Sequence, residues 1–148
     1  LSRNKIKNFT EYIDDYDNNN QAVNFYKQTN ISFSPNIISS ATLEYAPVSN
    51  LQIGLSGKFI SRQFLDNTSQ MNKSIKPYYT QELSTAYTFT NTHLKEIKLF
   101  VQVYNLFSTL YVANGYTFSY IYNSERSTSN YYFPMAPIHF MAGINIKL

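Results

Sequence analysis

Apolar and polar residues alternate along five segments of the chain, so that every second position is apolar. Successive side chains of a β-strand point to opposite faces of the sheet, and a period of two therefore predicts strands with one apolar and one polar face. The predicted strands cover residues 36–45, 51–60, 79–89, 97–104 and 139–148, with a sixth, incomplete one within residues 1–12. No segment has a convincing helical period.

The connections between the predicted strands alternate between long and short. Residues 14–33, 62–78 and 108–137 form long polar connections, whereas 47–50 and 90–96 form short ones. A transmembrane β-barrel has long extracellular loops, short periplasmic turns and strands of about 9–11 residues. The pattern therefore favours an all-β chain that forms an antiparallel transmembrane β-barrel segment. A soluble β-sandwich with one dry and one wet face has the same period and remains open.

Charge separates the two faces of the predicted strands. One face carries no charge. It is formed by alternate positions within Leu51–Leu55, Ile97–Val103 and Ile144–Leu148. The other face carries Glu44, Lys58, Glu82, Lys98 and Lys147. A Lys or Arg at the bilayer midplane costs about 2–4 kcal/mol. The uncharged face is therefore assigned to lipid, and the charged face to the lumen.

Composition narrows the function classes further. Of the 148 residues, 17% are aromatic and 14% are charged, against about 25% charged in an average soluble domain. The chain has no cysteine, which excludes a disulfide scaffold, a thiol nucleophile and a thiolate zinc site within it. The net charge of +3 comes from scattered single cations. This predicts that no nucleic acid is bound.

The C-terminal half carries a resemblance to a known family. Val103–Tyr111, Asn114–Tyr120, Asn130–Pro134 and the final strand together resemble the C-terminal end of TonB-dependent outer-membrane receptors, with a Bacteroidetes character. Upstream, Asn4–Glu11, Ile31–Ile38 and Gln63–Ser69 look like preceding barrel segments of the same receptors. The resemblance extends over nearly the whole chain.

The resemblance implies a fold and a role. Such receptors are barrels of about 22 strands with an internal plug, located in the Gram-negative outer membrane. They take up scarce ligands such as iron-siderophores or cobalamin, without a cofactor, using energy from the TonB complex. At roughly 20–30 residues per strand and loop, residues 1–148 correspond to about the last six strands, and the plug lies upstream.

Two further partners follow from the same resemblance. The implied partners are the lipid of the outer membrane and the barrel-assembly machinery, which recognises a C-terminal strand of alternating apolar residues. Here that signal consists of Phe140, Ala142, Ile144, Ile146 and Leu148, with Leu where the family usually ends in Phe.

Tyrosines in the last long connection are the strongest candidates for ligand binding. The candidates are Tyr116, Tyr120, Tyr122, Arg126, Tyr131, Tyr132 and, on the lumen face, His139. A tyrosine offers a rigid apolar ring and a hydroxyl, which suits an aromatic chelate or a sugar. Arg126 suits a carboxylate or a phosphate. The alternatives remain open: the rings pack the loop on itself, and His139 is a hydrogen-bonded wall residue.

Other motifs give weaker indications of metal binding or catalysis. Asp15, Asp17 and Asn19 space oxygens at alternate positions, but the EF-hand glycine and glutamate are missing. A loose calcium site in this loop stays an alternative. His93 is expected to be solvated in a short turn. No serine lies in a glycine-flanked elbow, so we expect no enzymatic activity. A complete small barrel and a soluble, tyrosine-rich, glycan-binding sandwich are the competing functions.

Overall fold

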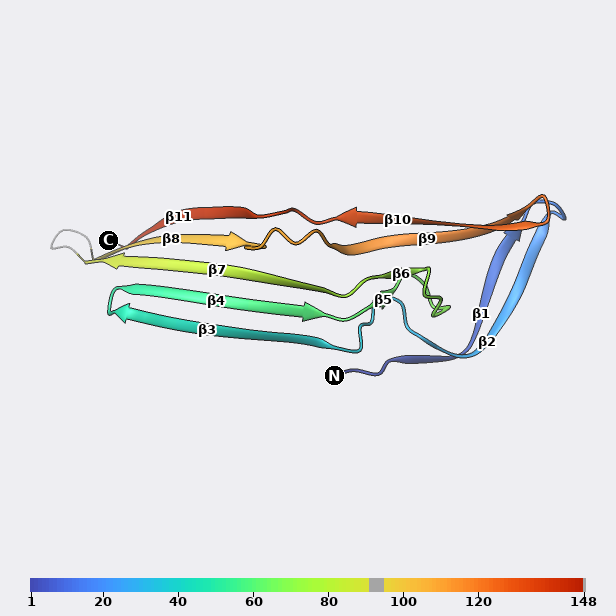
Figure 1. Cartoon of the computed structure of the whole chain (residues 1–148), viewed down its shortest axis with the longest axis horizontal. Helices are drawn as coiled ribbons and strands as arrows, with labels where there is room; N and C mark the ends of the chain where they lie inside the picture. The colour runs from blue at the N-terminus through green and yellow to red at the C-terminus, as the bar shows by residue number, and fades with distance from the viewer. Residues whose placement is uncertain (91–94, 148) are drawn as a thin grey trace. The chain divides into compact units, whose positions relative to one another are not determined.

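The computed structural model describes residues 1–90 and 95–147, and within these it is all-β (Figure 1). The long strands are β1 (Lys5–Asp15), β2 (Asn20–Asn30), β3 (Ile38–Val48), β4 (Leu51–Ile60), β7 (Tyr78–Phe89), β8 (Glu96–Tyr104), β9 (Val112–Tyr122), β10 (Glu125–Pro134) and β11 (His139–Lys147). The short strands β5 (Gln63–Phe64) and β6 (Ser74–Ile75) lie between β4 and β7. No described segment is a helix with the length and apolar character of a membrane span.

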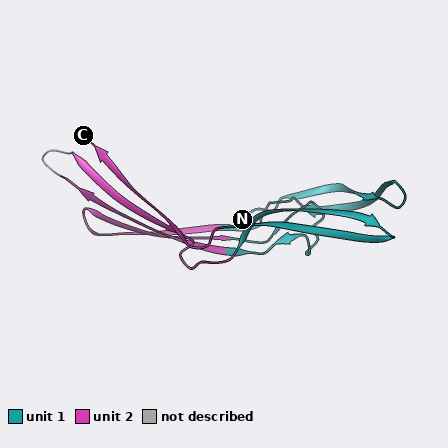
Figure 2. Cartoon of the chain, turned by 90° about the horizontal axis from the view of Figure 1, so that it is seen from above, with its two compact units in different colours: residues 1–38, 60–78, 111–135 teal, residues 39–59, 79–110, 136–148 magenta. Residues whose placement is uncertain are grey.

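The chain divides into two compact units, coloured separately in Figure 2. Unit 1 consists of residues 1–38, 60–78 and 111–135, and unit 2 of residues 39–59, 79–110 and 136–148. The sheet of unit 2 has the strand order β11-β8-β7-β4-β3. The main sheet of unit 1 has the order β10-β9-β1-β2, beside the small β5-β6 pair.

The strands of unit 2 correspond to the five that the period of two predicts. Strand β8 pairs antiparallel with both β7 and β11, in a register that places Leu83 and Phe140 opposite Val103. Directly paired residues share a face, so the apolar positions of these three strands align. Gly143 lies opposite Phe100, whose ring covers the space that a side chain at 143 would fill. These strand predictions are confirmed.

Asn105 fixes the chain where β8 ends. It is buried and has a φ of 52°, a backbone region that Asn adopts more readily than most residues. Its Nδ2 donates to the carbonyl oxygens of Thr109 and Ala136, both at 3.0 Å, and its Oδ1 accepts from the Thr109 amide at 2.9 Å. One side chain thereby joins the segments that follow β8 and precede β11.

The sheet of unit 1 is built from two hairpins. Strands β1 and β2 pair antiparallel, as do β9 and β10. Asn123 and Ser124, with φ of 52° and 61°, close the second hairpin, as the two-residue turn with two positive φ values requires. A short parallel contact, Asp14 with Tyr120, joins the hairpins.

One face of this sheet is covered by the connection between β4 and β7, here named the 61–77 loop. Ile13 of β1 and Leu65 and Ile75 of the loop are the buried apolar side chains of the described residues. The Leu65 amide donates to the Lys73 carbonyl at 2.9 Å, which closes the loop on itself. Unit 1 therefore has a small core between its sheet and its own loop.

Two of the predicted long loops are wrong. Residues 14–33 contain β2, and residues 108–137 contain β9 and β10. The described residues hold eleven strands, and the sheets are open rather than closed into a barrel. His93 and Leu148, which carry predictions above, lie outside the described residues.

Candidate functional site: the uncovered sheet faces of the two units

The sheet of unit 2 has one face that is apolar and uncovered. In the described part of this unit no apolar side chain is buried. Leu43 of β3 is 70% exposed, Ile144 65% and Phe140 76%. Large apolar surfaces of this kind mark contact with a membrane or a partner. Among the described residues of unit 2 there is no second sheet to cover this face, whereas a sandwich would require one.

The opposite face of the same sheet is polar and hollowed. A concavity of about 520 Å³ is lined by residues from all five strands, among them Glu44, Gln52, Ser84, Lys98, Gln102 and Asn145. Gly54 keeps the floor open, since a Cβ there would lie 2.6 Å from the Ser84 Oγ. Amides, hydroxyls and one charge of each sign can hydrogen-bond a polar ligand or a polar protein segment.

His139 lies on this polar face at the start of β11. It is exposed, pairs with Tyr104 across the ladder and stacks on that ring with centroids 5.1 Å apart. Its Nδ1 lies 2.8 Å from the Pro137 carbonyl oxygen. The histidine is therefore held in place by its neighbours and presents the rest of its ring to the outside.

The sheet of unit 1 separates the candidate residues onto two faces. Tyr120 pairs with Asp14 and Arg126 with Ile121, so neighbouring positions of β9 and β10 point in opposite directions. Arg126 and Tyr132 lie on the face that the 61–77 loop covers, where the Tyr132 hydroxyl donates to the Ser74 carbonyl at 3.3 Å. Tyr116, Tyr120, Tyr122 and Tyr131 lie on the other face, which is bare.

Aromatic rings form a continuous cluster on this bare face. Tyr116 stacks on Tyr131 with centroids 4.9 Å apart and an angle of 11°, and Phe118 stacks on Tyr131 at 6.0 Å. Tyr16, at the end of β1, meets Tyr120 edge-on at 5.9 Å. The rings lie between half-buried and exposed. The rings thus contact one another, as the alternative anticipated, and still present open surface.

The covered face contains a buried ionic cluster that sequence reasoning did not find. Lys73, which is 1% exposed, lies 3.1 Å from Glu11 Oε1 and 2.9 Å from Asp66 Oδ2. Arg126 donates to the same Glu11 oxygen at 2.8 Å, and the Tyr26 hydroxyl donates to Oε2, also at 2.8 Å. Two acids and two bases make the cluster neutral, as burial requires.

Burial and hydrogen bonds shift the pKa values of two members of this cluster, Glu11 and Tyr26. Burial raises the pKa of Glu11, but hydrogen bonds from Tyr26, Asn24 and Lys73 outweigh it and leave that pKa below its ordinary value. Burial, with the adjacent Glu11 carboxylate, raises the pKa of Tyr26. At neutral pH Glu11 is therefore ionised, and Tyr26 keeps its proton and donates it.

The acidic turn after β1 serves as a structural cap. Asp15 Oδ1 accepts from the Asp17 amide at 3.0 Å, and Asn18 donates to the same carboxylate through its amide and its side chain. These bonds lower the pKa of Asp15, the Asn18 side chain first. Asp17 accepts from the amides of Asn123 and Ser124 at 2.8 and 2.6 Å. Among the described residues no cluster of three potential metal ligands forms.

Sequence signals for these features differ in strength. The spacing of Tyr116, Phe118, Tyr120 and Tyr122 is a period of two, and it indicated a strand where a loop was predicted. Glu11 and Lys73 are 62 residues apart, and nothing in their local sequence predicts that they meet.

Comparison with known proteins places the fold. No protein-family model and no curated protein matches the chain. It is similar to the ferric-catecholate import receptor Fiu from E. coli K12 in its open form, with a TM-score of 0.58 and 19% identity over 85% of this chain and 18% of that one. For the closed form of Fiu the TM-score is 0.60 and the identity is 17%, over 85% of this chain and 17% of that one.

The ferric citrate transporter FecA in its unliganded form is a further match, with a TM-score of 0.59 and 22% identity over 76% of this chain and 17% of that one. At such identities the likeness establishes an all-β fold shared with part of these receptors. The chain spans 17–18% of the receptors' length.

Proposed function

We propose that the chain is the C-terminal part of the β-barrel of a TonB-dependent outer-membrane receptor, of the Bacteroidetes type, which imports a scarce ligand such as an iron chelate. The observation that carries the proposal is the bare apolar face of unit 2, backed by a polar face across a single layer. A wall between hydrocarbon and an aqueous lumen needs this construction. The likeness to Fiu and FecA and the resemblance of the sequence support it.

The proposal gives each unit a role. Strands β3, β4, β7, β8 and β11 span the membrane, and Phe140, Ala142, Ile144, Ile146 and Leu148 form the signal read by the barrel-assembly machinery. Unit 1 is extracellular, since its sheet carries charged residues on both faces (Glu11 on one, Asp14 on the other). The plug and the TonB contact belong to other parts of the protein.

Residues for the imported ligand are proposed on the polar surfaces. His139 faces the lumen of the wall, and Arg126 and Tyr132 lie on the loop-covered face of unit 1. Arg126 uses one of its five N–H donors on Glu11, and its side chain keeps 32% of its surface exposed. It can therefore pair with an anionic chelate without leaving Glu11.

Location and transport test the proposal separately. The protein should fractionate with outer membranes and require detergent for extraction. Cells should take up a radiolabelled ferric chelate only while the TonB complex is energised, and deletion of the gene should abolish that uptake. Recovery of the protein from the aqueous fraction would refute the receptor and favour the soluble, glycan-binding alternative.

Single-residue variants localise the ligand. Arg126→Gln and His139→Gln should each raise the chelate concentration needed for half-maximal uptake, with the protein still present in the membrane. Lys76→Gln, an exposed cation on the 61–77 loop, is the matched control. Unchanged uptake in both variants would remove these residues from the ligand site.

A further inference from the structure

Lys73 is a primary amine that the fold of unit 1 removes from solvent. Its side chain is 2% exposed, and two of the buried apolar residues of the unit, Leu65 and Ile75, come from the same 61–77 loop. A buried ion pair is by itself weak evidence for stability, because apolar residues of similar volume are often as stable in its place. A lysine amine in such surroundings is also a nucleophile that can attack a carbonyl carbon.

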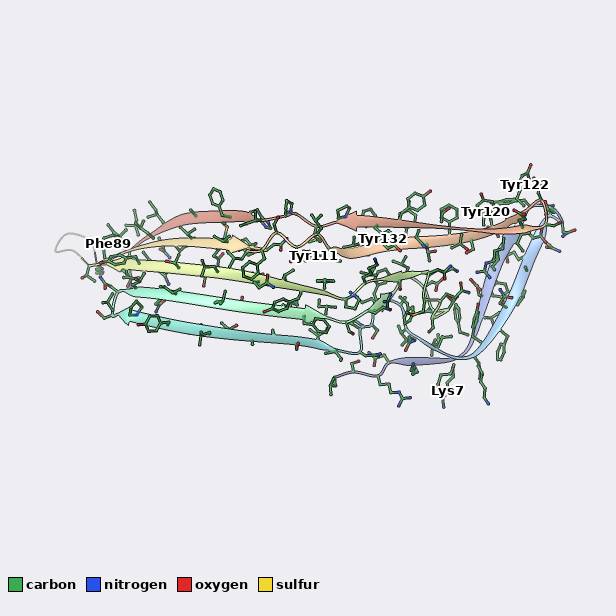
Figure 3. All side chains as sticks on the ribbon, in the orientation of Figure 1. Lys7, Phe89, Tyr111, Tyr120, Tyr122 and Tyr132 are labelled. Atoms are coloured by element: carbon green, nitrogen blue, oxygen red, sulfur yellow. The ribbon has the colours of Figure 1, made fainter. Side chains whose placement is uncertain are left out.

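The fold of the loop brings the Lys73 amine to one carboxyl group. Strands β5 and β6 pair antiparallel, and the Leu65 amide donates to the Lys73 carbonyl at 2.9 Å. The hydroxyl of Tyr132, labelled in Figure 3, donates to the adjacent Ser74 carbonyl at 3.3 Å. Lys73 Nζ lies 2.9 Å from Asp66 Oδ2. Backbone contacts therefore hold the two groups close together, and such proximity removes much of the entropic barrier to a reaction between them.

The two oxygens of the Asp66 carboxyl group have different surroundings. Oδ1 accepts from the Thr68 amide at 2.9 Å and from the Thr68 hydroxyl at 2.6 Å, whereas Oδ2 accepts from Lys73. Two fixed donors on one oxygen stabilise the negative charge that grows there when a nucleophile adds to the carboxyl carbon. Oδ1 is therefore placed to remain as a carbonyl oxygen, and Oδ2 to leave.

Glu11 provides a proton carrier beside the same amine. Its Oε1 lies 3.1 Å from Lys73 Nζ, within the distance over which a carboxylate takes up or returns a proton. Arg126 donates to this oxygen at 2.8 Å, and Tyr26 and Asn24 donate to Oε2 at 2.8 and 3.2 Å. These bonds hold Glu11 as a carboxylate in a fixed orientation toward the amine.

We propose that Lys73 and Asp66 form an isopeptide bond, with Glu11 as the proton carrier. Glu11 accepts a proton from the Lys73 ammonium, and the free amine adds to Asp66 Cγ. The Nζ–Cγ bond forms and the Cγ–Oδ2 bond breaks. Two of the three ammonium protons, transferred through Glu11, leave with Oδ2 as water, and the third stays on the amide nitrogen. The step consumes no oxidant and no cofactor.

The bond has two consequences for unit 1. It closes residues 66–73 into a covalent ring and so fixes the fold of the 61–77 loop over the face that carries Glu11 and Arg126. It also removes one positive and one negative charge together, so the cluster stays neutral, as burial requires. The new amide N–H remains beside Glu11 Oε1 and can donate to it.

Peptide masses from the full protein, denatured and digested with trypsin, test the bond. Trypsin does not cut after an acylated lysine, and Lys76 precedes a proline. The bond should therefore leave residues 63–95 as one peptide, lighter than its sequence by one water. Fragmentation should release no ions from cleavage between residues 66 and 73. Without the bond, residues 63–73 and 74–95 appear as two peptides at the masses of their sequences.

Three variants and a control assign the roles. Glu11→Gln should form the bond more slowly by about 10²–10⁴-fold, the usual contribution of a positioned acid or base. Asp66→Asn should form the same bond with loss of ammonia, so that its linked peptide has the mass of the parent's linked peptide. Asp66→Ala should give the two separate peptides. Lys76→Gln, an exposed cation of the same loop, should link as the parent does. Circular dichroism of each variant checks that the sheet persists.

The parent protein alone can overturn the inference. Separate peptides 63–73 and 74–95 at the masses of their sequences would exclude the bond. A loss of water with the cut after Lys73 still made would place the dehydration elsewhere and would exclude it too. Full linkage in Glu11→Gln at the rate of the parent would contradict the role of Glu11. The test reads neither membrane location nor uptake, so its failure leaves the receptor function standing.

Discussion

Each unit is built on a single sheet of long strands, but the two units differ in whether a face of that sheet is covered. Unit 1 covers one face of its sheet with its own loop and seals it with Ile13, Leu65 and Lys73. Unit 2 leaves both faces uncovered by the described residues. An apolar sheet face in water costs about 25 cal/mol for each Å² exposed. Unit 1 can therefore stabilise itself locally, whereas unit 2 has no comparable cover among its own described residues.

The ionic cluster of unit 1 should give the largest effect. Lys73→Met leaves Glu11 and Asp66 without their shared cation, and breaking a buried ion pair costs about 3–5 kcal/mol. The 61–77 loop should then become open to trypsin at Arg62, which limited proteolysis detects. Lys76→Met is the exposed control. If the loop stays protected in Lys73→Met, the cluster does not hold it.

The apolar face of unit 2 should respond next. Val101→Lys places a charge on this face, at a cost of about 2–4 kcal/mol in hydrocarbon, whereas Gln102→Lys places it on the polar face. Urea unfolding of the protein in lipid vesicles should show the loss for position 101 alone. Equal effects at both positions would mean that the two faces meet the same solvent.

Acid should loosen unit 1 before unit 2. The pKa of Glu11 is lowered in the folded chain, so its contribution to stability is present above its ordinary value of about 4.5 and is lost as pH falls through the folded pKa. Hydrogen exchange of the backbone amides in the 61–77 loop should accelerate as the pH falls below the ordinary pKa of Glu11. Glu11→Gln should remove this dependence on pH. Faster exchange of the loop amides as the pH rises toward 7 would be the opposite pH dependence and would contradict this role of Glu11.

The smallest effect belongs to the Asp17 cap. Asp17→Ala removes acceptors for the amides of Asn123 and Ser124, at a cost of roughly 1 kcal/mol for exposed hydrogen bonds. Exchange of these two amides should accelerate, with the Lys73 cluster intact. Asn18→Ala, which affects only the Asp15 side of the turn, is the comparison. Unchanged exchange of these two amides would show that the Asp17 hydrogen bonds do not hold the two hairpins together.

The sequence could predict unit 2 better than unit 1 for a physical reason. A single layer with one apolar and one polar face requires strict alternation, and Ile97, Leu99 and Val101 display it. In β2 the covered face contacts a polar cluster rather than an apolar core, so Asn24 and Tyr26 gave no signal of a buried face. Lys73 and Glu11 meet only through the folding of the 61–77 loop, which no local pattern encodes.

Contact between the apolar face of unit 2 and hydrocarbon can be tested most directly with single cysteines, because the chain has none of its own. A fluorophore is attached at each position from 97 to 103 in turn, in protein reconstituted with lipids brominated on their acyl chains. Quenching should be strong at 97, 99, 101 and 103 and weak at 98, 100 and 102. Uniform quenching, or stronger quenching at the even positions, would contradict the assignment of this face to lipid.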